Sequence, residues 1–459
     1  MIGSAGTILA ETYCGKIMRI AIIGAGISGL STAFYLQRGR PDCELLIFDA
    51  NPAPGGTMCT VECEGFRFEA GGNGFLTNKP DSLQLVNDAG AGHLQLPSSE
   101  LARKRYIFTD RLHRLPETPP AFLVSRLLSL PQKLRVAAEV FIPPKRDDSD
   151  ETLQSFGYRR MGKAFTDVFL DAMTAGIYAT TPGRVSVNAA FPLVVQLERE
   201  YGGLFRGMLA RRKRQAGPGG ILMSFQCGVG RFIDHLQSIL RADWRLGTPV
   251  SGILRDAGGY RVLSAAGEEH VDQVVVSATA PAAAAMLRGL DTDIASRLAA
   301  IEYSPLAVVG FGYRHLDHPL DGFGLLTTTA AGLPILGVLW DSSIFPDRAP
   351  AGSKCLRVMI GGQRNPEQMQ LDNAGLLAAA RAGIRMTMGV DAEPDVSFVK
   401  RWAQGIPNYP LGHLRAMDEL FAQVARYPGL HLNCNAYRGI AMNDCVRNSR
   451  ELAQRLGAG

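Results

Sequence analysis

A short strand that runs straight into closely spaced glycines is the feature that most constrains this chain. Residues 19–23 are rich in isoleucine, which predicts a buried strand. Gly24, Gly26 and Gly29 follow in G-x-G-x-x-G spacing, and residues 30–36 continue as a predicted helix. In such a turn the first glycine permits the sharp bend, the second admits a pyrophosphate, and the third lets helix and strand pack closely. The segment therefore predicts an α/β fold that binds a nucleotide.

The second strand of this predicted unit ends in an acidic residue. Residues 44–48 form a mostly apolar strand, and Asp49 lies twenty residues beyond Gly29. A carboxylate at this place accepts hydrogen bonds from an adenosine ribose. The free N–H groups at the start of the helix would hold the phosphates, with Ala25 and Ser28 in the same turn. Strand, glycines, helix, strand and acid in register predict a dinucleotide site.

NAD and FAD both bind to a glycine turn followed by an acid, so other residues must indicate which dinucleotide is bound. Further glycines give this indication. Gly55 and Gly56 follow the acid within seven residues, and residues 66–72 supply another glycine-dense turn. FAD needs a second glycine-rich backbone surface near its isoalloxazine ring, whereas a nicotinamide needs less. The pattern favours FAD, and ordinary turn glycines between strands are the alternative interpretation.

Composition excludes several other classes of protein. A chain of 459 residues with 46% hydrophobic and 20% charged residues suits two or three folded domains. The net charge of +5 is small, and no basic helix with interleaved aromatic residues predicts binding to nucleic acid. The eight cysteines form no CxxC pair, so we expect no metal site and a reducing, cytoplasmic location. No apolar run reaches the roughly 18 to 20 residues that span a bilayer.

Residues 115–217 change character from strands to helices. Prolines break the start, and apolar residues recur at helical spacing over 153–173. Residues 122–128 form an apolar stretch that basic residues border as far as Arg146. Such a stretch is commonly core or the wall of a substrate cavity, but it also suits a surface that lies in a membrane interface without crossing it. Both interpretations stay open from the residues alone.

After residue 218 the pattern returns to short strands. Residues 260–263 and 273–279 are predicted strands, and the second is expected to rejoin the nucleotide-binding sheet. Residues 430–439 give a further strand and a glycine turn, and a helix is predicted from Asp444 onward. This last unit again presents a helix N-terminus that can meet the cofactor.

Several segments together resemble a known family. The most specific are residues 197–202 (Leu-Glu-Arg-Glu-Tyr-Gly) and 409–414 (Tyr-Pro-Leu-Gly-His-Leu). The others are the segments 105–107, 175–179, 190–192, 435–440 and 444–445. On these residues the chain resembles the oxygen-dependent protoporphyrinogen oxidase family, which includes the related coproporphyrinogen III oxidases, within the FAD-linked amine-oxidase-like flavoproteins. The resemblance covers residue 19 to the end.

The resemblance implies a mixed α/β (α+β) fold of three parts around one cleft. These parts are a discontinuous Rossmann-like FAD-binding domain, a substrate domain with a mixed sheet, and a helical domain that docks on membranes. The expected ranges are 1–17 for a mobile extension, 18–90, 218–285 and 425–459 for the FAD domain, 91–114 and 286–424 for the substrate domain, and 115–217 for the helical domain.

The resemblance also implies roles for particular residues. Arg105 stands where the family has an arginine that pairs with a substrate propionate, which suits a planar guanidinium. Gly176 stands where a backbone carbonyl faces pyrrole N–H groups, and the missing Cβ lets a flat macrocycle come close. Asp444 and Cys445 are expected beside the flavin. No side chain is expected as catalytic base, because the cofactor supplies the chemistry and the protein supplies position.

The implied activity is oxidation of a porphyrinogen in heme synthesis. Three two-electron dehydrogenations would convert protoporphyrinogen IX to protoporphyrin IX, with O2 as acceptor and H2O2 as product. Coproporphyrinogen III is the alternative substrate, and another amine-oxidase-like flavoenzyme is the alternative enzyme. Outside the enzymes, the alternative is a flavin-binding protein without turnover. Peripheral contact with the inner face of a membrane and a homodimer also stay open.

The chain departs from the family's pattern at a few positions. Ala53 stands where an arginine is common, and residues 70–74 replace the usual Gly-Pro. Ala441 and Asn443 stand where glycine and proline are common. We expect these departures to alter flavin contacts and redox tuning more than binding itself, because the glycine turn is intact.

Overall fold

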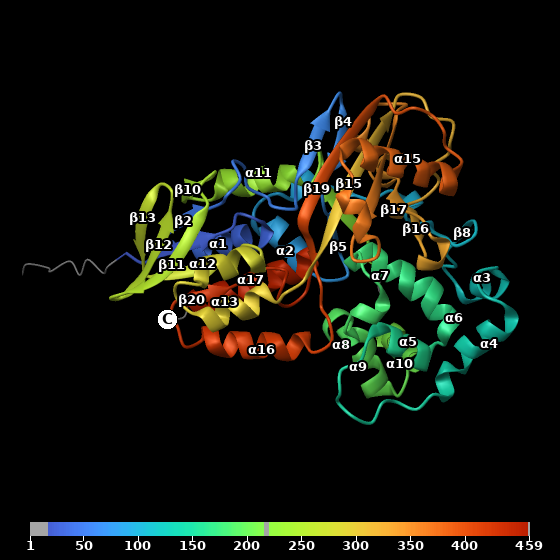
Figure 1. The fold of residues 1–459 in the computed structure, drawn as a ribbon, viewed down its shortest axis with the longest axis horizontal. Coiled ribbons are helices and arrows are strands. Elements are labelled where there is room, and N and C mark those ends of the chain that lie inside the picture. The colour runs from blue at the N-terminus through green and yellow to red at the C-terminus, as the bar shows by residue number, and fades with distance from the viewer. Residues whose placement is uncertain (1–16, 215–219, 458–459) are drawn as a thin grey trace, which may run out of the picture.

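The glycine turn lies at the carboxyl edge of a five-stranded parallel sheet, on the left of Figure 1. In this computed structural model, which describes residues 17–214 and 220–457, the strand order is β10-β2-β1-β14-β20. The bounds in that order are Asp243–Arg245, Glu44–Phe48, Arg19–Ile23, Gln273–Val276 and Leu430–Leu432. Segments from distant parts of the chain build one sheet, and the expected mixed α/β class is confirmed.

Helices bury both faces of this sheet, which suits its apolar parallel strands. Alternate residues of β1 point to opposite faces. On one face β1 packs with α1 (Ile27–Gly39) and α17 (Met442–Gly457). On the other face it packs with α12 (Ala280–Leu287), α13 (Thr292–Ala299) and α16 (His413–Val424).

Two of these helices lie in a range that the family resemblance gives to the substrate domain. The helices α13 and α16 belong to residues 286–424, yet their buried side chains share a hydrophobic cluster with Val274 of β14. Ile294, Leu298 and Leu420 are each 0% exposed there. A helix packs where its apolar stripe finds a complementary face. Position along the chain therefore does not decide which sheet a helix covers.

A mixed seven-stranded sheet forms a second layered unit, at the upper right of Figure 1. Its order is β19-β15-β18-β17-β16-β7-β8. The bounds in that order are Val396–Pro407, Tyr303–Tyr313, Lys354–Gly361, Ile335–Leu339, Gly324–Thr327, Arg105–Phe108 and Leu112–Arg114. Neighbouring strands are antiparallel except β16 and β7, which run parallel. The helix α15 (Asn373–Met388) packs against the sheet through Leu376, Ala380 and Ile384.

Smaller sheets and helices accompany the two large sheets. Three small antiparallel sheets have the strand orders β3-β4, β5-β9-β6 and β11-β12-β13. Their bounds are Thr60–Cys63, Phe66–Glu69, Phe75–Leu76, Leu222–Phe225, Gln95–Pro97, Val250–Asp256, Gly259–Ser264 and Gly267–Val271. The helices α2, α11 and α14 span Asp81–Asp88, Gly230–Ile239 and Asp341–Ile344.

The region at the lower right of Figure 1 is helical from α3 to α10. The bounds are Pro119–Val124, Leu130–Ala137, Leu153–Arg160, Lys163–Phe165, Asp171–Tyr178, Val187–Ala190, Pro192–Tyr201 and Leu204–Arg214. The helical pattern over 153–173 is interrupted after α5, because Gly162 adopts a φ of 90°. Glycine reaches this region without strain. A π-helical turn at Thr166–Leu170 then leads into α7.

A buried ion pair holds the helical region together. Arg160 of α5 and Glu139 are both fully buried, and the guanidinium donates to the carboxylate. Glu139 also accepts hydrogen bonds from the N–H groups of Leu204 at 2.8 Å and Phe205 at 3.3 Å, at the start of α10. A buried charge is tolerated only when it is paired and its remaining hydrogen-bonding positions are filled. This pair therefore fixes how α5 and α10 meet.

Two findings bear on the extension and on membranes. Residues 1–16 of the expected extension lie outside the described residues. Among the helices that the structure describes, none is long and apolar enough to cross a membrane.

Candidate functional site

A cavity of about 750 Å³ opens beside the glycine turn. Its walls come from the five-stranded sheet, from the loop after β4, from β19 of the seven-stranded sheet and from the start of α17. Predicted residues that line it are Gly24, Gly26, Ser28, Asp49, Gly55, Gly56 and Cys445. The cavity therefore extends between the two large sheets.

The three glycines of the G-x-G-x-x-G turn differ in what a side chain would meet. Gly24 has a φ of 107°, and a Cβ there would lie 2.7 Å from the backbone carbon of Ser277. A Cβ on Gly29 would lie 1.9 Å from the carbonyl oxygen of Gly24, so the third glycine allows helix and strand to touch. A Cβ on Gly26 would meet nothing within 4 Å, so this position faces open cavity.

The first turn of α1 is free to bind an anion. Gly26 is its N-cap residue and supplies no side-chain cap, and the first turn contains no acidic residue. The N–H groups at a helix start have no partner within the helix, and the helix dipole adds positive potential. A pyrophosphate at this place would accept hydrogen bonds from the N–H groups, and its negative charge would be stabilised by the helix dipole.

Asp49 is oriented before any ligand binds. One carboxylate oxygen accepts a hydrogen bond from the N–H of Ala25 at 2.8 Å. The other accepts from the backbone N–H of Asn51 at 2.8 Å and from its side-chain amide at 3.0 Å. Asp49 and Asn51 both line the cavity. Ala25 thus contributes by positioning the acid, and its own side chain is buried in the core.

The second glycine pair closes the turn from the other side. Gly55 donates its N–H to the carbonyl of Ala25 at 2.8 Å. Gly55 and Gly56 have φ angles of 121° and 57°, which favour glycine. A Cβ on Gly56 would lie 3.5 Å from the Cα of Gly26, so the two glycine turns touch.

The start of α17 supplies another wall. Cys445 lines the cavity, and burial raises the pKa of its thiol to about 11, so the thiol stays protonated at neutral pH. Asp444 is not among the lining residues that the structure describes. Its carboxylate instead binds Lys79 at 2.7 Å and Arg447 at 3.0 Å.

Asn443, a departure from the family pattern, has a packing role. It is buried, and its amide donates to the carbonyl of Leu76 at 2.9 Å while its carbonyl accepts from the N–H of Ser82 at 3.0 Å. Proline offers neither of these side-chain contacts. Ala441 is exposed and lines the cavity, and Ala53 is exposed.

The two predicted substrate residues lie outside this cavity. Arg105 is an exposed residue of β7, and its guanidinium lies 5.1 Å from the centroid of the Phe323 ring. Gly176 is an exposed residue of α7, and a Cβ there would lie 2.8 Å from the side chain of Leu326. Leu326 belongs to β16, which pairs with β7. Both residues therefore belong to the part of the molecule where α7 meets this end of the seven-stranded sheet.

Several lining residues were not predicted. They are Thr248–Val250, Ser277–Thr279, Tyr303 and Trp402–Gly405. Two hydrogen bonds tie β19 across the cavity: Trp402 donates its indole N–H to the carbonyl of Ala70 at 2.6 Å, and Thr279 donates its hydroxyl to Gln404 at 2.5 Å. Nothing local in β19 marks it as a cofactor wall, since its position depends on how the two sheets meet.

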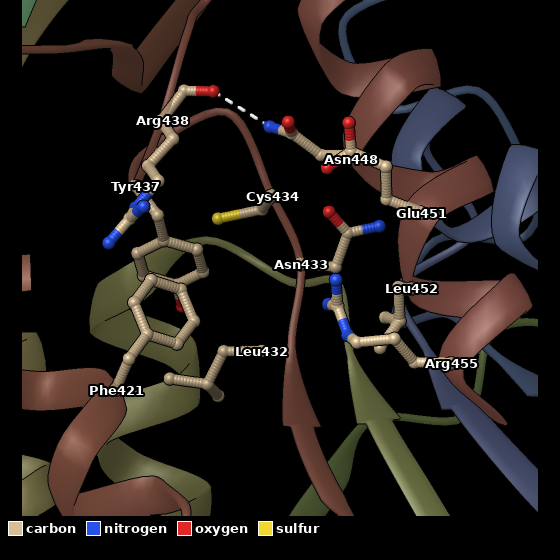
Figure 2. A pocket seen from close by; sticks show the side chains of 10 residues that line it. All are labelled: Phe421, Leu432, Asn433, Cys434, Tyr437, Arg438, Asn448, Glu451, Leu452 and Arg455. Carbon is tan, nitrogen blue, oxygen red and sulfur yellow. Dashed lines mark hydrogen bonds between the residues drawn. The ribbon is translucent and has the colours of Figure 1, made fainter. Parts of the chain in front are cut away.

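A second cavity of about 250 Å³ lies between α16, β20 and α17 (Figure 2). Asn448 donates to the carbonyl of Arg438 at its edge, at 2.7 Å. Cys434 lines both cavities, and Figure 2 shows its thiol pointing into the smaller one. Burial raises the pKa of this thiol to about 12, so it is a poor nucleophile at neutral pH.

The large cavity suits a flavin dinucleotide. It combines an uncapped helix start, an oriented acid near the ribose position and a second glycine surface, and it reaches from one sheet to the other. The family model for flavin containing amine oxidoreductases matches residues 27–457. The chain belongs to this family. It is therefore an oxidoreductase with a flavin cofactor, as the resemblance implied.

Curated relatives cover nearly the whole chain. The coproporphyrinogen III oxidase of Bacillus subtilis (strain 168) is 26% identical, over 93% of this chain and 95% of its own length. The chloroplastic protoporphyrinogen oxidase of Oryza sativa subsp. japonica is 29% identical, over 95% of this chain and 87% of its own length. The stated resemblance to these two groups is confirmed.

Solved structures show the same fold. A crystal structure from Exiguobacterium sp. 255-15 that carries the name of a protoporphyrinogen oxidase superposes with a TM-score of 0.85, at 25% identity, over 96% of this chain and 99% of that chain. A reduced UDP-galactopyranose mutase superposes with a TM-score of 0.75, at 16% identity, over 96% of both chains. At the lower identity the likeness concerns the fold alone.

Gly26→Val should release the flavin. The new side chain would occupy the open space before the first turn of α1, where the pyrophosphate is expected. We expect at least a hundredfold weaker reconstitution of the apoprotein with FAD, followed by flavin fluorescence. Gly39→Val is the matched control, because Gly39 ends the same helix and a Cβ there also meets nothing within 4 Å. A full flavin spectrum in the purified Gly26→Val protein would show that this turn does not hold the phosphates.

Proposed function

We propose that this protein uses FAD to oxidise a porphyrinogen, with protoporphyrinogen IX as substrate and O2 as acceptor. The observation that carries the proposal is the dinucleotide cavity in a chain that matches porphyrinogen oxidases along almost its entire length. Three two-electron dehydrogenations would yield protoporphyrin IX, with O2 as the acceptor and H2O2 as the product.

The described cavity contains no evident catalytic base. Its titratable lining residues are Asp49, Tyr303, Cys434 and Cys445. Asp49 is engaged with Ala25 and Asn51, and burial raises the pKa values of the other three. Bound FAD would accept a hydride from a meso carbon, and the pyrrole nitrogens of the substrate can lose the protons. The protein's part is to hold the macrocycle in place and keep water out.

We place the macrocycle where α7 meets the seven-stranded sheet. Gly176 leaves its backbone exposed there, and Ile177 beside it is 40% exposed, which is high for a large apolar residue. Arg105 supports this placement because no ion-pair partner for it exists among the described residues, so its guanidinium is available to a propionate. Gly176 would then admit the flat ring and Arg105 would bind one edge.

The apolar character of this surface favours the vinyl groups of protoporphyrinogen IX. Coproporphyrinogen III carries two more carboxylates, and each needs a cation or water because a buried, unpaired charge is costly. Ile177 and Leu326 offer neither. Coproporphyrinogen III is the alternative substrate, because the relative from Bacillus subtilis is named as an oxidase of coproporphyrinogen III.

Anaerobic mixing with each candidate substrate tests the function. Loss of the oxidised flavin absorbance should follow addition of protoporphyrinogen IX, and kcat/KM in air should be higher for it than for coproporphyrinogen III. Putrescine and cyclohexylamine serve as control substrates for other members of the wider family, and neither should bleach the flavin. A higher kcat/KM for coproporphyrinogen III would move the protein to that reaction, and bleaching by amines alone would contradict the proposal.

Arg105→Ala should raise KM on the order of thirtyfold, because it removes a charge-assisted pair with a propionate. The value of kcat should change little, since the pair lies away from the reacting carbon. Arg103→Ala is the control, because Arg103 is also exposed in the same basic triplet but already pairs with Glu100 at 2.8 Å. Equal KM values for both variants would place Arg105 outside the substrate site.

We further propose that the end of the helical region lies on a membrane surface. Large apolar side chains are exposed there: Leu123 64%, Val124 82%, Leu130 68%, Leu134 62% and Phe141 83%. Lys133 donates to the carbonyls of Leu123 at 2.7 Å and Ser125 at 2.6 Å, which holds α3 against α4 and keeps these side chains on neighbouring elements. Arg126 and Arg146 are exposed beside them and suit anionic headgroups.

The double variant Val124→Ser/Phe141→Ser should bind vesicles of phosphatidylcholine and phosphatidylglycerol at least tenfold more weakly in a flotation assay. Burial of each side chain in the interface contributes on the order of 1.5 to 3 kcal/mol. Met386→Ser is the control, since Met386 is 58% exposed on α15, which packs against the seven-stranded sheet outside the helical region. If the double variant floats as well as the parent chain, this surface is not the membrane contact.

A further inference from the structure

One arginine links the cavity wall to the core of the seven-stranded sheet. Arg357 lies in β18 and is 0% exposed. Its guanidinium makes two hydrogen bonds to the carboxylate of Asp341, one of them at 3.0 Å. It also donates to the side chain of Asn73 and to the carbonyls of Glu69 and Gly71, the last at 3.2 Å. These five bonds use all five N–H donors of the side chain.

The contacts of Arg357 fall on the glycine-rich loop that follows β4. Every carbonyl from Glu69 to Gly71 is held from the side of the seven-stranded sheet. Arg357 binds the first and the third, and Trp402 of β19 binds the carbonyl of Ala70 at 2.6 Å. The carboxylate of Glu69 is held as well, by Arg348 at 2.8 Å. The backbone of this loop therefore has little freedom to rotate.

Fixing a carbonyl also fixes the next N–H. In a trans peptide the C=O and N–H groups point in opposite directions. The bond from Arg357 to the carbonyl of Gly71 therefore turns the N–H of Gly72 away from the sheet. The neighbouring peptide shows the same relation: the carbonyl of Glu69 faces Arg357, while the N–H of Ala70 donates to Cys59 at 2.8 Å.

Gly72 lines the cofactor cavity, and a Cβ built on it would meet nothing within 4 Å. Within the described part of the chain, this N–H has no hydrogen-bond acceptor. A Cβ on the preceding Gly71 would lie 2.2 Å from the carbonyl oxygen of Thr57, so the loop packs closely against Thr57 and cannot move toward it.

We propose that Arg357 is a positioning residue that raises the reduction potential of the bound flavin by holding the Gly72 N–H toward it. A reduced flavin has gained two electrons and carries more negative charge, so a fixed N–H donor stabilises it more than the oxidised form. Arg357 is not among the cavity-lining residues that the structure describes, and its donors are all engaged with the loop and with Asp341. The loop is the element through which it acts.

The shape of the side chain matters as much as its charge. Lysine would keep the positive charge beside Asp341 but has only three donors on a single nitrogen. It cannot reach Asp341, Asn73 and two loop carbonyls together. R357K should therefore retain the buried ion pair and the fold while it frees the Gly71–Gly72 peptide.

The measurement is the two-electron potential of the flavin, determined with dithionite and a redox dye at equilibrium. For R357K we expect affinity for reduced flavin to fall at least tenfold relative to affinity for oxidised flavin. That change equals a potential about 30 mV more negative. The inference rests on flavin binding alone and no porphyrinogen is used, so failure of the proposed activity would leave this test unaffected.

R160K is the matched control. Arg160 is another fully buried arginine paired with a buried carboxylate, but it lies in the helical region and is not among the cavity-lining residues that the structure describes. Its potential should stay at the parent value. An equal shift of the flavin potential in R160K would show that the loss of any buried arginine pair explains the effect. An unchanged potential in R357K would overturn the proposal.

A second variant covers the case in which R357K does not fold. N73A removes one acceptor of Arg357 and leaves Asp341 and the Gly71 carbonyl bound. It should shift the potential in the same direction by a smaller amount, with affinity for oxidised flavin within about threefold of the parent. A folded N73A protein with an unchanged potential would contradict the proposed role of the loop.

Discussion

The uncapped first turn of α1 is the constraint around which the rest of the structure is arranged. Its free N–H groups need an anion, and they must stay at the mouth of a cavity to find one. A buried polar network holds the turn there. Asn433 donates to Thr32 and to Ser449, both at 2.9 Å, and Ser449 donates to the carbonyl of Ser28 at 2.9 Å. Hydrogen bonds thereby join α17 to α1 beside the nucleotide site.

Buried charged groups join the seven-stranded sheet to the loop after β4. Arg357 with Asp341 and Arg348 with Glu69 are almost wholly buried, and they join the seven-stranded sheet to the loop that lines the cavity. Buried ion pairs contribute little net stability, because desolvation offsets their attraction. Their directional hydrogen bonds instead specify one arrangement of a backbone that glycine leaves flexible. A wall built in this way is suited to holding a cofactor at a defined distance and orientation.

Much of the site could be predicted because its signals are local. The turn from Gly24 to Gly29, the acid at Asp49 and the pair Gly55–Gly56 all lie within forty residues and obey short-range backbone geometry. The walls supplied by Thr248–Val250 and by Trp402–Gly405 could not be predicted, since strands with this pattern serve many purposes. The same limit applies to α13 and α16, whose amphipathic patterns say that they are buried on one side but not against which sheet.

The sequence by itself predicted a nucleotide-binding turn, because glycine at this spacing permits the sharp bend at Gly24 and the close helix–strand packing at Gly29. It also indicated the family, through segments such as 409–414, and a mixed α/β class. Only the tertiary structure decided that α17 is hydrogen-bonded to α1 and that β19 lines the cavity. It also decided that Arg357 reaches a loop 284 residues away at Asn73. Contacts of this kind leave no periodic or local signal, because they depend on how separately formed layers are brought together.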